Sequence, residues 1–117
     1  MKETFVRKIF YYKNYYLDFF GTLKDDVQKK FNWTLKLIAT LERVPYKYFK
    51  HIQNSTGLYE IRVESGGNIF RVFCFFDKGK MIILVNGFQK KSQKTPKKEI
   101  EMAEKLKKQY FDEKTKK

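Results

Sequence analysis

Residues 58–86 read LYEIRVESGGNIFRVFCFFDKGKMIILVN, three apolar segments separated by the glycine-containing sequences SGGN and DKGK. Glycine reaches the positive φ values that tight hairpin turns need, so both separators are typical of turns. We therefore predict strands at Leu58–Glu64, Ile69–Phe76 and Met81–Asn86, joined as an antiparallel meander.

The alternation of side chains along the strands predicts the register of this meander. The two turns are taken to be centred on Gly66–Gly67 and on Lys78–Gly79. In that register Arg62 lies opposite Arg71, and Arg71 lies opposite Asn86. Successive side chains point to opposite faces, so one face becomes wholly apolar or aromatic. Its members are Tyr59, Ile61, Val63, Phe70, Val72, Cys74, Phe76, Met81, Ile83 and Val85. A one-residue slip would drive charges into this face, which we expect to be the core.

A long amphipathic helix is predicted before the meander. Apolar residues recur at helical spacing from Lys24 to Arg43, and Thr22 and Asp25 resemble a capping box. Upstream, VRKIFYY has the composition of a strand and NYYLDFFGTL that of a short helix. The tyrosine-rich segment that follows the long helix, residues 46–57, is interpreted as a connector.

After the meander, Thr95 can cap a C-terminal helix whose first residue is Pro96. The apolar stripe of this helix consists of Ile100, Ala103, Leu106 and Tyr110. The charged tail is expected to fray from about residue 112. Together these elements predict an α+β fold in a single domain spanning residues 1–117.

The chain of 117 residues carries 26 Lys and Arg against 13 Asp and Glu, a net charge of +13. Such a potential suits phosphate backbones or acidic protein partners. No apolar run approaches the roughly 18 residues of a membrane span, and the N-terminus lacks the features of a signal peptide. We therefore expect a cytoplasmic protein without membrane association. The single cysteine, Cys74, excludes an internal disulfide, and with only His51 beside it a zinc site has too few soft ligands.

A lysine-rich segment follows the third predicted strand. Residues 86–99, NGFQKKSQKTPKKE, contain no acid before Glu99. Its five lysines are Lys90, Lys91, Lys94, Lys97 and Lys98. Like charges repel, so such a run is costly unless an anion docks there; otherwise it is a solvated loop. Together with Phe88, Tyr59 and the tyrosines of the connector, these lysines would suit single-stranded nucleic acid, where cations track the backbone and aromatic rings stack on bases. The alternative is that most of these aromatic residues belong to the core.

Arg62 and Arg71 repel each other across neighbouring strands, by an amount comparable to the ~0.2–1 kcal/mol of ordinary cross-strand pairs. Two explanations are open. Glu60 and Glu64, on the same face, would neutralise them in an ion network. Alternatively, the two guanidinium groups hold an anion such as phosphate, which their bidentate geometry suits.

In order and spacing, the segments GLYEIRV, NIFRVFCFFDKGK and GFQKKSQKTPKKEIEMA resemble the phage-derived HigB-like branch of the RelE/ParE toxin superfamily. The likeness runs from about Val44 to Tyr110. It implies a small, curved, mainly antiparallel sheet packed against N-terminal helices, with a C-terminal helix in addition. It also implies a cognate antitoxin, and the RelE and HigB members cleave mRNA on the ribosome. We expect the antitoxin to cover the basic face with an acidic segment.

By this resemblance, Arg62 and Arg71 match basic positions on the second and third strands of the family, and Lys90, Lys91 and Lys94 match its basic loop. The implied reaction is attack of a ribose 2′-hydroxyl on the adjacent phosphate. The arginines and Lys91 would stabilise the developing charge, and no metal or small-molecule cofactor is required.

The general base is left open between two residues. His51 is of the residue type that most often acts as a general base, and Glu60 lies in the arginine row. Further RNA contacts are assigned to Asn86, Phe88, Lys97 and Lys98. Two other functions are open on the same fold: a ParE-like gyrase poison, and a nucleic-acid-binding regulator that cuts nothing. The arginine row with its lysine rim favours RNA, because a binding poison has no evident need for convergent phosphate ligands.

Overall fold

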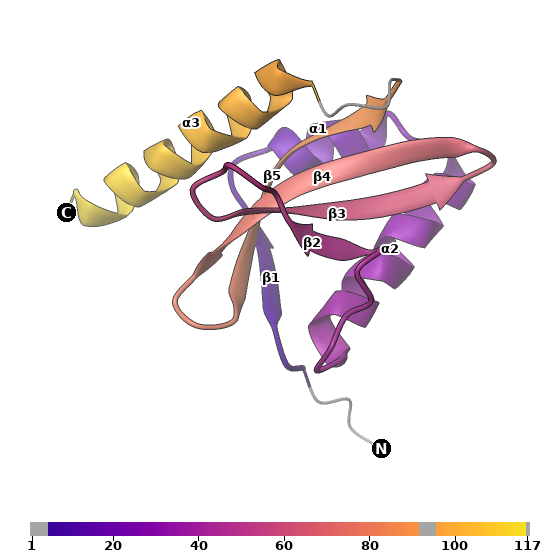
Figure 1. Cartoon of the computed structure of the whole chain (residues 1–117), viewed down its shortest axis with the longest axis horizontal. Helices are drawn as coiled ribbons and strands as arrows, with labels where there is room; N and C mark the ends of the chain where they lie inside the picture. The colour runs from indigo at the N-terminus through magenta and orange to yellow at the C-terminus, as the bar shows by residue number, and fades with distance from the viewer. Residues whose placement is uncertain (1–4, 92–95, 117) are drawn as a thin grey trace.

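The computed structural model describes residues 5–91 and 96–116. Its elements in chain order are β1 (Lys8–Tyr11), α1 (Tyr15–Gly21), α2 (Asp25–Thr40), β2 (Phe49–His51), β3 (Leu58–Ser65), β4 (Asn68–Asp77), β5 (Met81–Lys90) and α3 (Lys97–Thr115). They form the predicted α+β fold, with an open five-strand mixed sheet (Figure 1). In the described part of the chain, no helix has the length and apolar character needed to cross a membrane.

The strand order of the sheet is β1-β5-β4-β3-β2. β3, β4 and β5 form the predicted antiparallel meander, and β2 extends it antiparallel at one edge. β1 joins the other edge, parallel to β5. This arrangement is compatible with the RelE-like fold that the resemblance implies.

The helices cover the two faces of the sheet separately (Figure 1). Tyr16 of α1 and Phe31 and Ile38 of α2 belong to one hydrophobic core, and Ala103 and Leu106 of α3 belong to a second. The central strands are therefore buried on both sides, which accounts for the nearly continuous apolar character of β4 and β5.

The hairpin of β3 and β4 has the predicted register. Gly66 and Gly67 have φ values of 57° and 81°, the left-handed conformation that a two-residue hairpin turn requires. Arg62 consequently lies opposite Arg71. The predicted core residues of the two strands pack on the side of α2, namely Tyr59, Ile61, Val63, Phe70, Val72, Cys74 and Phe76.

The predicted register of β5 is wrong because the second turn is longer than two residues. Asp77 pairs with Met81 rather than with Lys80. The side chains of β5 therefore exchange faces, and Ile82 and Leu84 enter the core beside α2. The residues predicted for that core, Met81, Ile83 and Val85, instead pack on the side of α3. The segment MIILV is apolar at every position, so the exchange places no charge in either core.

A β-bulge shifts β5 further along the sheet. The register changes between Val72 and Cys74, with one additional residue on the β5 side. Arg71 therefore lies opposite Phe88, and the predicted pairing of Arg71 with Asn86 is wrong. The bulge lies beside Gly87, and a glycine inside a strand often marks such a site.

The N-terminus of α2 differs from the predicted capping box. Lys24 is the N-cap residue and makes no side-chain capping bond. Thr22 Oγ1 donates instead to the carbonyl oxygen of Phe19, at 2.7 Å. The helix ends at Thr40, before the predicted Arg43.

Two other boundaries differ from the prediction. β2 lies inside the segment that was interpreted as a connector, since three residues are too few to show a strand pattern. Pro96 is the N-cap of α3 rather than its first residue. The predicted cap, Thr95, lies outside the described residues.

The C-terminal helix continues to Thr115 instead of fraying near residue 112. Its last turns are tied to the end of β4 and to Tyr12, the residue that follows β1. Lys114 Nζ lies 2.8 Å from Asp77 Oδ2, and the hydroxyl of Tyr12 donates to Glu113 Oε2 at 2.7 Å. These polar contacts hold the highly charged end of the helix in place.

Gly87 permits the close approach of β5 and α1. A β-carbon at this position would overlap the ring of Phe19. Replacing Gly87 with Val should therefore lower the free energy of unfolding by about 1–3 kcal/mol, the usual range for overpacking. Urea denaturation would measure this change. As a control, Gly21→Ala adds a β-carbon with nothing within 4 Å, and it should keep or slightly raise stability. Wild-type stability of the Gly87→Val protein would contradict the packing.

Candidate functional site

The two arginines of the β3–β4 hairpin lie side by side, and each has a carboxylate partner. Arg71 is 6% exposed and forms an ion pair with Glu60, which is 3% exposed. Arg62 Nη2 lies 3.2 Å from Oε1 of the exposed Glu64. The structure thus contains the ion network that the sequence offered as one of two explanations for the arginine pair.

The guanidinium of Arg71 is incompletely satisfied. Its Nε is buried and has no hydrogen-bond partner within the described residues. Burial lowers the pKa of Arg71, because the charged form loses hydration. A buried donor without an acceptor is unfavourable, so an anion that reached this guanidinium would supply a missing partner.

A cleft of about 270 Å³ lies against this arginine pair, and we call it the arginine cleft. It is lined by Tyr46, Lys47, Phe49 and Lys50 from β2 and the segment before it, and by Glu60, Arg62 and Arg71 from β3 and β4. Lys50 Nζ lies 5.5 Å from the centroid of the Tyr46 ring. The lining therefore combines four cations with one carboxylate and two aromatic rings.

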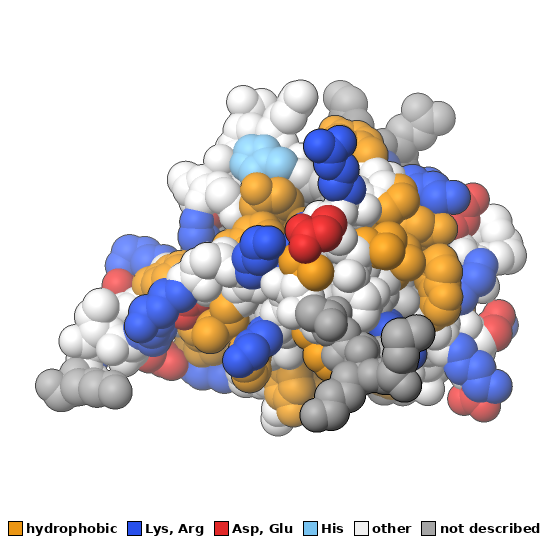
Figure 2. Space-filling view, turned by 90° about the horizontal axis from the view of Figure 1, so that it is seen from below, with side chains coloured by type: hydrophobic (Ala, Val, Ile, Leu, Met, Phe, Trp, Pro, Cys, Tyr) orange, Lys and Arg blue, Asp and Glu red, His pale blue; other side chains and the backbone are white. Residues whose placement is uncertain are grey.

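Lys90 brings another cation to the same region. It is the last residue of β5, and its pKa is lowered, first by burial and then by the positive charges of Arg71, Lys50 and Arg62. Cations depress the pKa of a lysine in this way when they lie close to it. On the face drawn in Figure 2, basic side chains are also spread more widely than acidic ones. Such a convergence of cations favours an anionic ligand.

The other lysines of the predicted basic loop lie on the surface. Lys91 is exposed directly after β5, and Lys97 and Lys98 are exposed in the first turn of α3. Lys94 lies outside the described residues. Exposed lysines therefore lie both at the start and at the end of the basic loop.

Asn86 and Phe88, both predicted to contact RNA, are buried and make contacts within the fold. Asn86 is buried, and its Nδ2 donates to the carbonyl oxygen and to Oε1 of Glu99, each at 3.1 Å. Phe88 is 9% exposed, and its ring packs against Phe73 at a centroid distance of 5.3 Å. Asn86 thus anchors the start of α3, and Phe88 belongs to the core beneath that helix.

The structure does not bring His51 to the arginines. His51 pairs with Tyr59 at the end of β2, and the two rings meet edge-on at 5.2 Å. Lys50 pairs with Glu60, so the alternation of side chains points His51 to the opposite face. Of the two candidate bases, Glu60 lines the arginine cleft and His51 does not.

Sequence reasoning named the connector tyrosines as candidates for stacking, but it missed Lys47 and Lys50 as lining residues. The alternation of aromatic and basic residues in YKYFK is the signal that could have indicated them. Cys74 lies in the core, where burial raises the pKa of its thiol, so it is not poised as a nucleophile. Within residues 5–91 and 96–116, no group of three or more His, Cys, Asp or Glu side chains is arranged to hold a metal ion.

A mixed sheet with helices on both faces and a cationic cleft at its arginine hairpin defines a small RelE-like α+β protein. Residues 18–108 match the family model of the phage-derived Gp49-like proteins (DUF891). This match spans most of the chain, which therefore belongs to the Gp49-like family, a member of the RelE/toxin-like group. The family is consistent with a toxin of a toxin–antitoxin pair. No curated protein matches the chain.

The buried ion pair of Arg71 and Glu60 predicts that Arg71→Gln lowers the stability of the protein. Removing the guanidinium leaves the Glu60 carboxylate buried without its partner, which should cost about 3–5 kcal/mol of stability. Thermal and urea unfolding would measure the loss. The loss should shrink as the pH falls, because protonation of the stranded carboxylate removes the buried charge. Arg62→Gln is the matched control, since its partner Glu64 is exposed. A melting temperature of Arg71→Gln at or above that of the wild type would contradict the ion network.

Proposed function

We propose that this protein is a HigB-like toxin of a type II toxin–antitoxin pair that cleaves mRNA on the ribosome, in the cytoplasm. The observation that carries the proposal is the convergence of Lys47, Lys50, Arg62 and Arg71 in the lining of one cleft, with Lys90 close to three of them. Phosphate is the anion that such a set recognises best, because guanidinium groups bind it bidentately and ammonium groups add point charges.

The proposed reaction needs positioning and charge stabilisation from the protein. A ribose 2′-hydroxyl loses its proton to a base and attacks the adjacent phosphorus, forming a 2′,3′-cyclic phosphate. The 5′-oxygen of the next nucleotide leaves and takes up a proton. Arg62, the more exposed of the two arginines, is placed to contact the phosphoryl oxygens as their charge develops.

Arg71 and Glu60 would act as a unit beneath the phosphate. Glu60 is the carboxylate in the lining of the arginine cleft, so we assign it as the candidate base in place of His51. An incoming phosphate competes with Glu60 for Arg71. That exchange would free the carboxylate to accept a proton at the moment that substrate arrives.

The ribosome would supply the alignment of the mRNA. The arginine cleft presents one carboxylate that already pairs with Arg71, and no second carboxylate and no histidine accompanies it among the described residues that line the cleft. Holding the 2′-hydroxyl in line with the scissile bond then becomes the larger contribution to rate. Purified mRNA without ribosomes should therefore be a poor substrate.

Pairing of both arginines with carboxylates in the free protein also suits a function without cleavage, either as a gyrase poison or as a nucleic-acid-binding regulator. Inducing the protein in growing cells and mapping RNA ends and DNA breaks separates the three. New ends within translated mRNA support the toxin that cleaves mRNA, DNA breaks with intact mRNA support the gyrase poison, and neither supports the regulator.

Arg62→Gln tests the catalytic assignment without unfolding the protein. Losing one preorganised donor to the phosphoryl oxygens should lower translation-dependent mRNA cleavage about 10²- to 10³-fold. The melting temperature should change little, because the lost ion pair is solvent-exposed. Lys105→Gln, an exposed position on α3, controls for the change in net charge and should cleave normally. Undiminished cleavage by Arg62→Gln would remove Arg62 from the mechanism.

The expected antitoxin should bind the arginine cleft through charge. A protein that suppresses the toxicity of this chain on coexpression would serve as the partner. Its affinity for the chain should fall as the salt concentration rises, because screening weakens contacts between exposed charges. Lys50→Gln should weaken binding and reduce the salt dependence, whereas Lys105→Gln should do neither. Binding that is insensitive to salt and leaves Arg62 accessible would show that the antitoxin docks elsewhere.

A further inference from the structure

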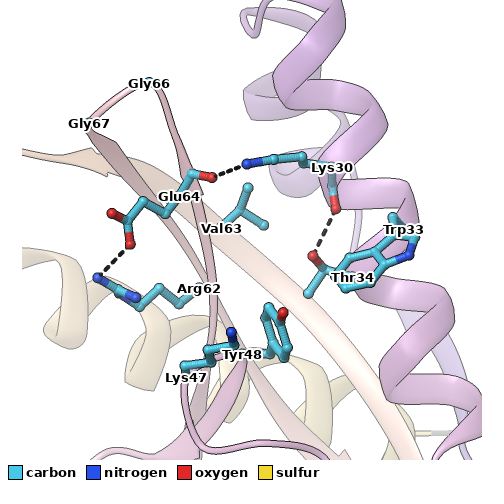
Figure 3. Close-up of a pocket in the computed structure, with 10 residues that line it drawn as sticks. All are labelled: Lys30, Trp33, Thr34, Lys47, Tyr48, Arg62, Val63, Glu64, Gly66 and Gly67. Carbon is cyan, nitrogen blue, oxygen red and sulfur yellow. Dashed lines mark hydrogen bonds and ion pairs between the residues drawn. The ribbon is translucent and has the colours of Figure 1, made fainter.

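A second hollow, of about 700 Å³, lies between α2 and the end of β3, and we call it the tryptophan groove (Figure 3). Lys30, Trp33 and Thr34 line it from α2. Lys47 and Tyr48 line it from the segment before β2, and Arg62, Val63 and Glu64 from β3. Three of these residues, Lys47, Arg62 and Glu64, also belong to the site described above.

Trp33 is the feature that singles out this groove. It is the single tryptophan of the chain and is 54% exposed, although its ring is the largest apolar surface that a side chain offers. Its contact with Tyr48 is edge-on, with ring centroids 5.6 Å apart and an interplanar angle of 76°. Tyr48 therefore supports the indole while more than half of Trp33 stays open to a further stacking partner.

The polar lining of the groove is cationic. Lys30, Lys47 and Arg62 face one carboxylate, Glu64, which is already paired with Arg62. Lys47 Nζ also lies 5.0 Å from the centroid of the Tyr48 ring. An aromatic platform among cations that outnumber the one carboxylate matches a nucleic-acid strand, whose bases stack and whose phosphates carry negative charge.

The tryptophan groove adjoins the arginine cleft, because Lys47 and Arg62 line both. A strand bound in the arginine cleft could therefore extend past Lys47 to reach Trp33.

The open edge of β3 could in principle accept a peptide strand instead. β2 does not extend this far, since the last bond between the two runs from Arg62 N to the carbonyl oxygen of Tyr48. However, the exposed carbonyl oxygen of Glu64 is already bonded to Lys30 Nζ at 2.7 Å (Figure 3). A lysine held against an edge strand opposes the addition of another strand. The groove is therefore better suited to a nucleic acid than to an added β-strand.

We propose that the tryptophan groove binds single-stranded RNA flanking the scissile phosphate, with one base stacked on Trp33 and the neighbouring phosphates on Lys30 and Lys47. This inference rests on the proposed function for the identity of the strand. It adds a binding site outside the arginine cleft, and it assigns a role to the exposed tryptophan.

The single tryptophan provides a direct test. Titrating the intact protein with a short oligouridylate should quench the fluorescence of Trp33, because a stacked base quenches indole emission. The affinity should fall steeply with salt, since phosphates release counterions when they are neutralised. Lys47→Gln should reduce the salt slope by about one.

Substitutions at Trp33, read by the anisotropy of labelled RNA, complete the test. Trp33→Ala should weaken binding about ten- to a hundredfold, the loss expected for one stacked base. Trp33→Phe should recover most of the affinity, because a ring is retained. Met102→Ala, another exposed apolar residue on a helix outside the groove, should bind as the wild type does.

Three results would overturn the inference: no quenching by the oligouridylate, equal affinity for Trp33→Ala and the wild type, or quenching by polyglutamate that exceeds quenching by RNA. The last would assign the groove to an acidic protein partner. The test is separable from the proposed function. RNA binding at Trp33 without mRNA cleavage would sink the toxin chemistry and leave the groove intact, whereas cleavage that is indifferent to Trp33 would do the reverse.

Discussion

The two-glycine turn at Gly66–Gly67 is the constraint on which the rest of the site depends. Its left-handed backbone closes the β3–β4 hairpin in a single register, and that register places Arg62 directly opposite Arg71. Two like charges directly opposite each other on neighbouring strands are unfavourable in an isolated hairpin. Anions must accompany them, and Glu60 and Glu64, on the same face of β3, supply those anions within the chain.

The two internal ion pairs differ in a way that matters for function. The pair of Arg62 with Glu64 is exposed, so water and salt compete with it and its net contribution is small. The pair of Arg71 with Glu60 is buried, where the loss of hydration offsets much of the attraction between the charges. A ligand can therefore replace Glu64 as the partner of Arg62 at little cost in free energy. The buried pair holds the charged guanidinium of Arg71 in position for a ligand.

The sequence predicted those parts of the fold in which polar and apolar residues alternate, and it failed where they do not. In β3, charged residues mark one face, so a wrong register would have been visible in the pattern. In β5, the run MIILV is apolar in either register, and nothing in DKGK distinguishes a two-residue turn from a three-residue turn. The result was the wrong pairing of Arg71 with Asn86 in place of Phe88. The Arg62–Arg71 pair was predicted correctly because it depends only on the first turn.

The part of the site that the sequence could not supply comes from segments distant in the chain. The tryptophan groove joins α2 and the segment before β2 to the end of β3. The arginine cleft joins β2 and the segment before it to β3 and β4. The proximity of these segments depends on the pairing of β2, a strand of three residues with no pattern of its own. Trp33 itself fits an amphipathic helix, and only its exposure in the folded protein distinguishes it from a core residue.

The anchoring of α3 by Asn86 explains how the lysine-rich loop can contribute to an anion site. The side-chain amide of Asn86 holds Glu99, in the first turn of α3, against β5. That contact fixes Lys97 and Lys98 relative to Lys90 and Lys91, on the other side of the loop. Lysines in the first turn of a helix oppose its dipole, so stability of the free protein does not account for them. A phosphate bound near the helix start would offset this penalty, because the same lysines would then attract the ligand.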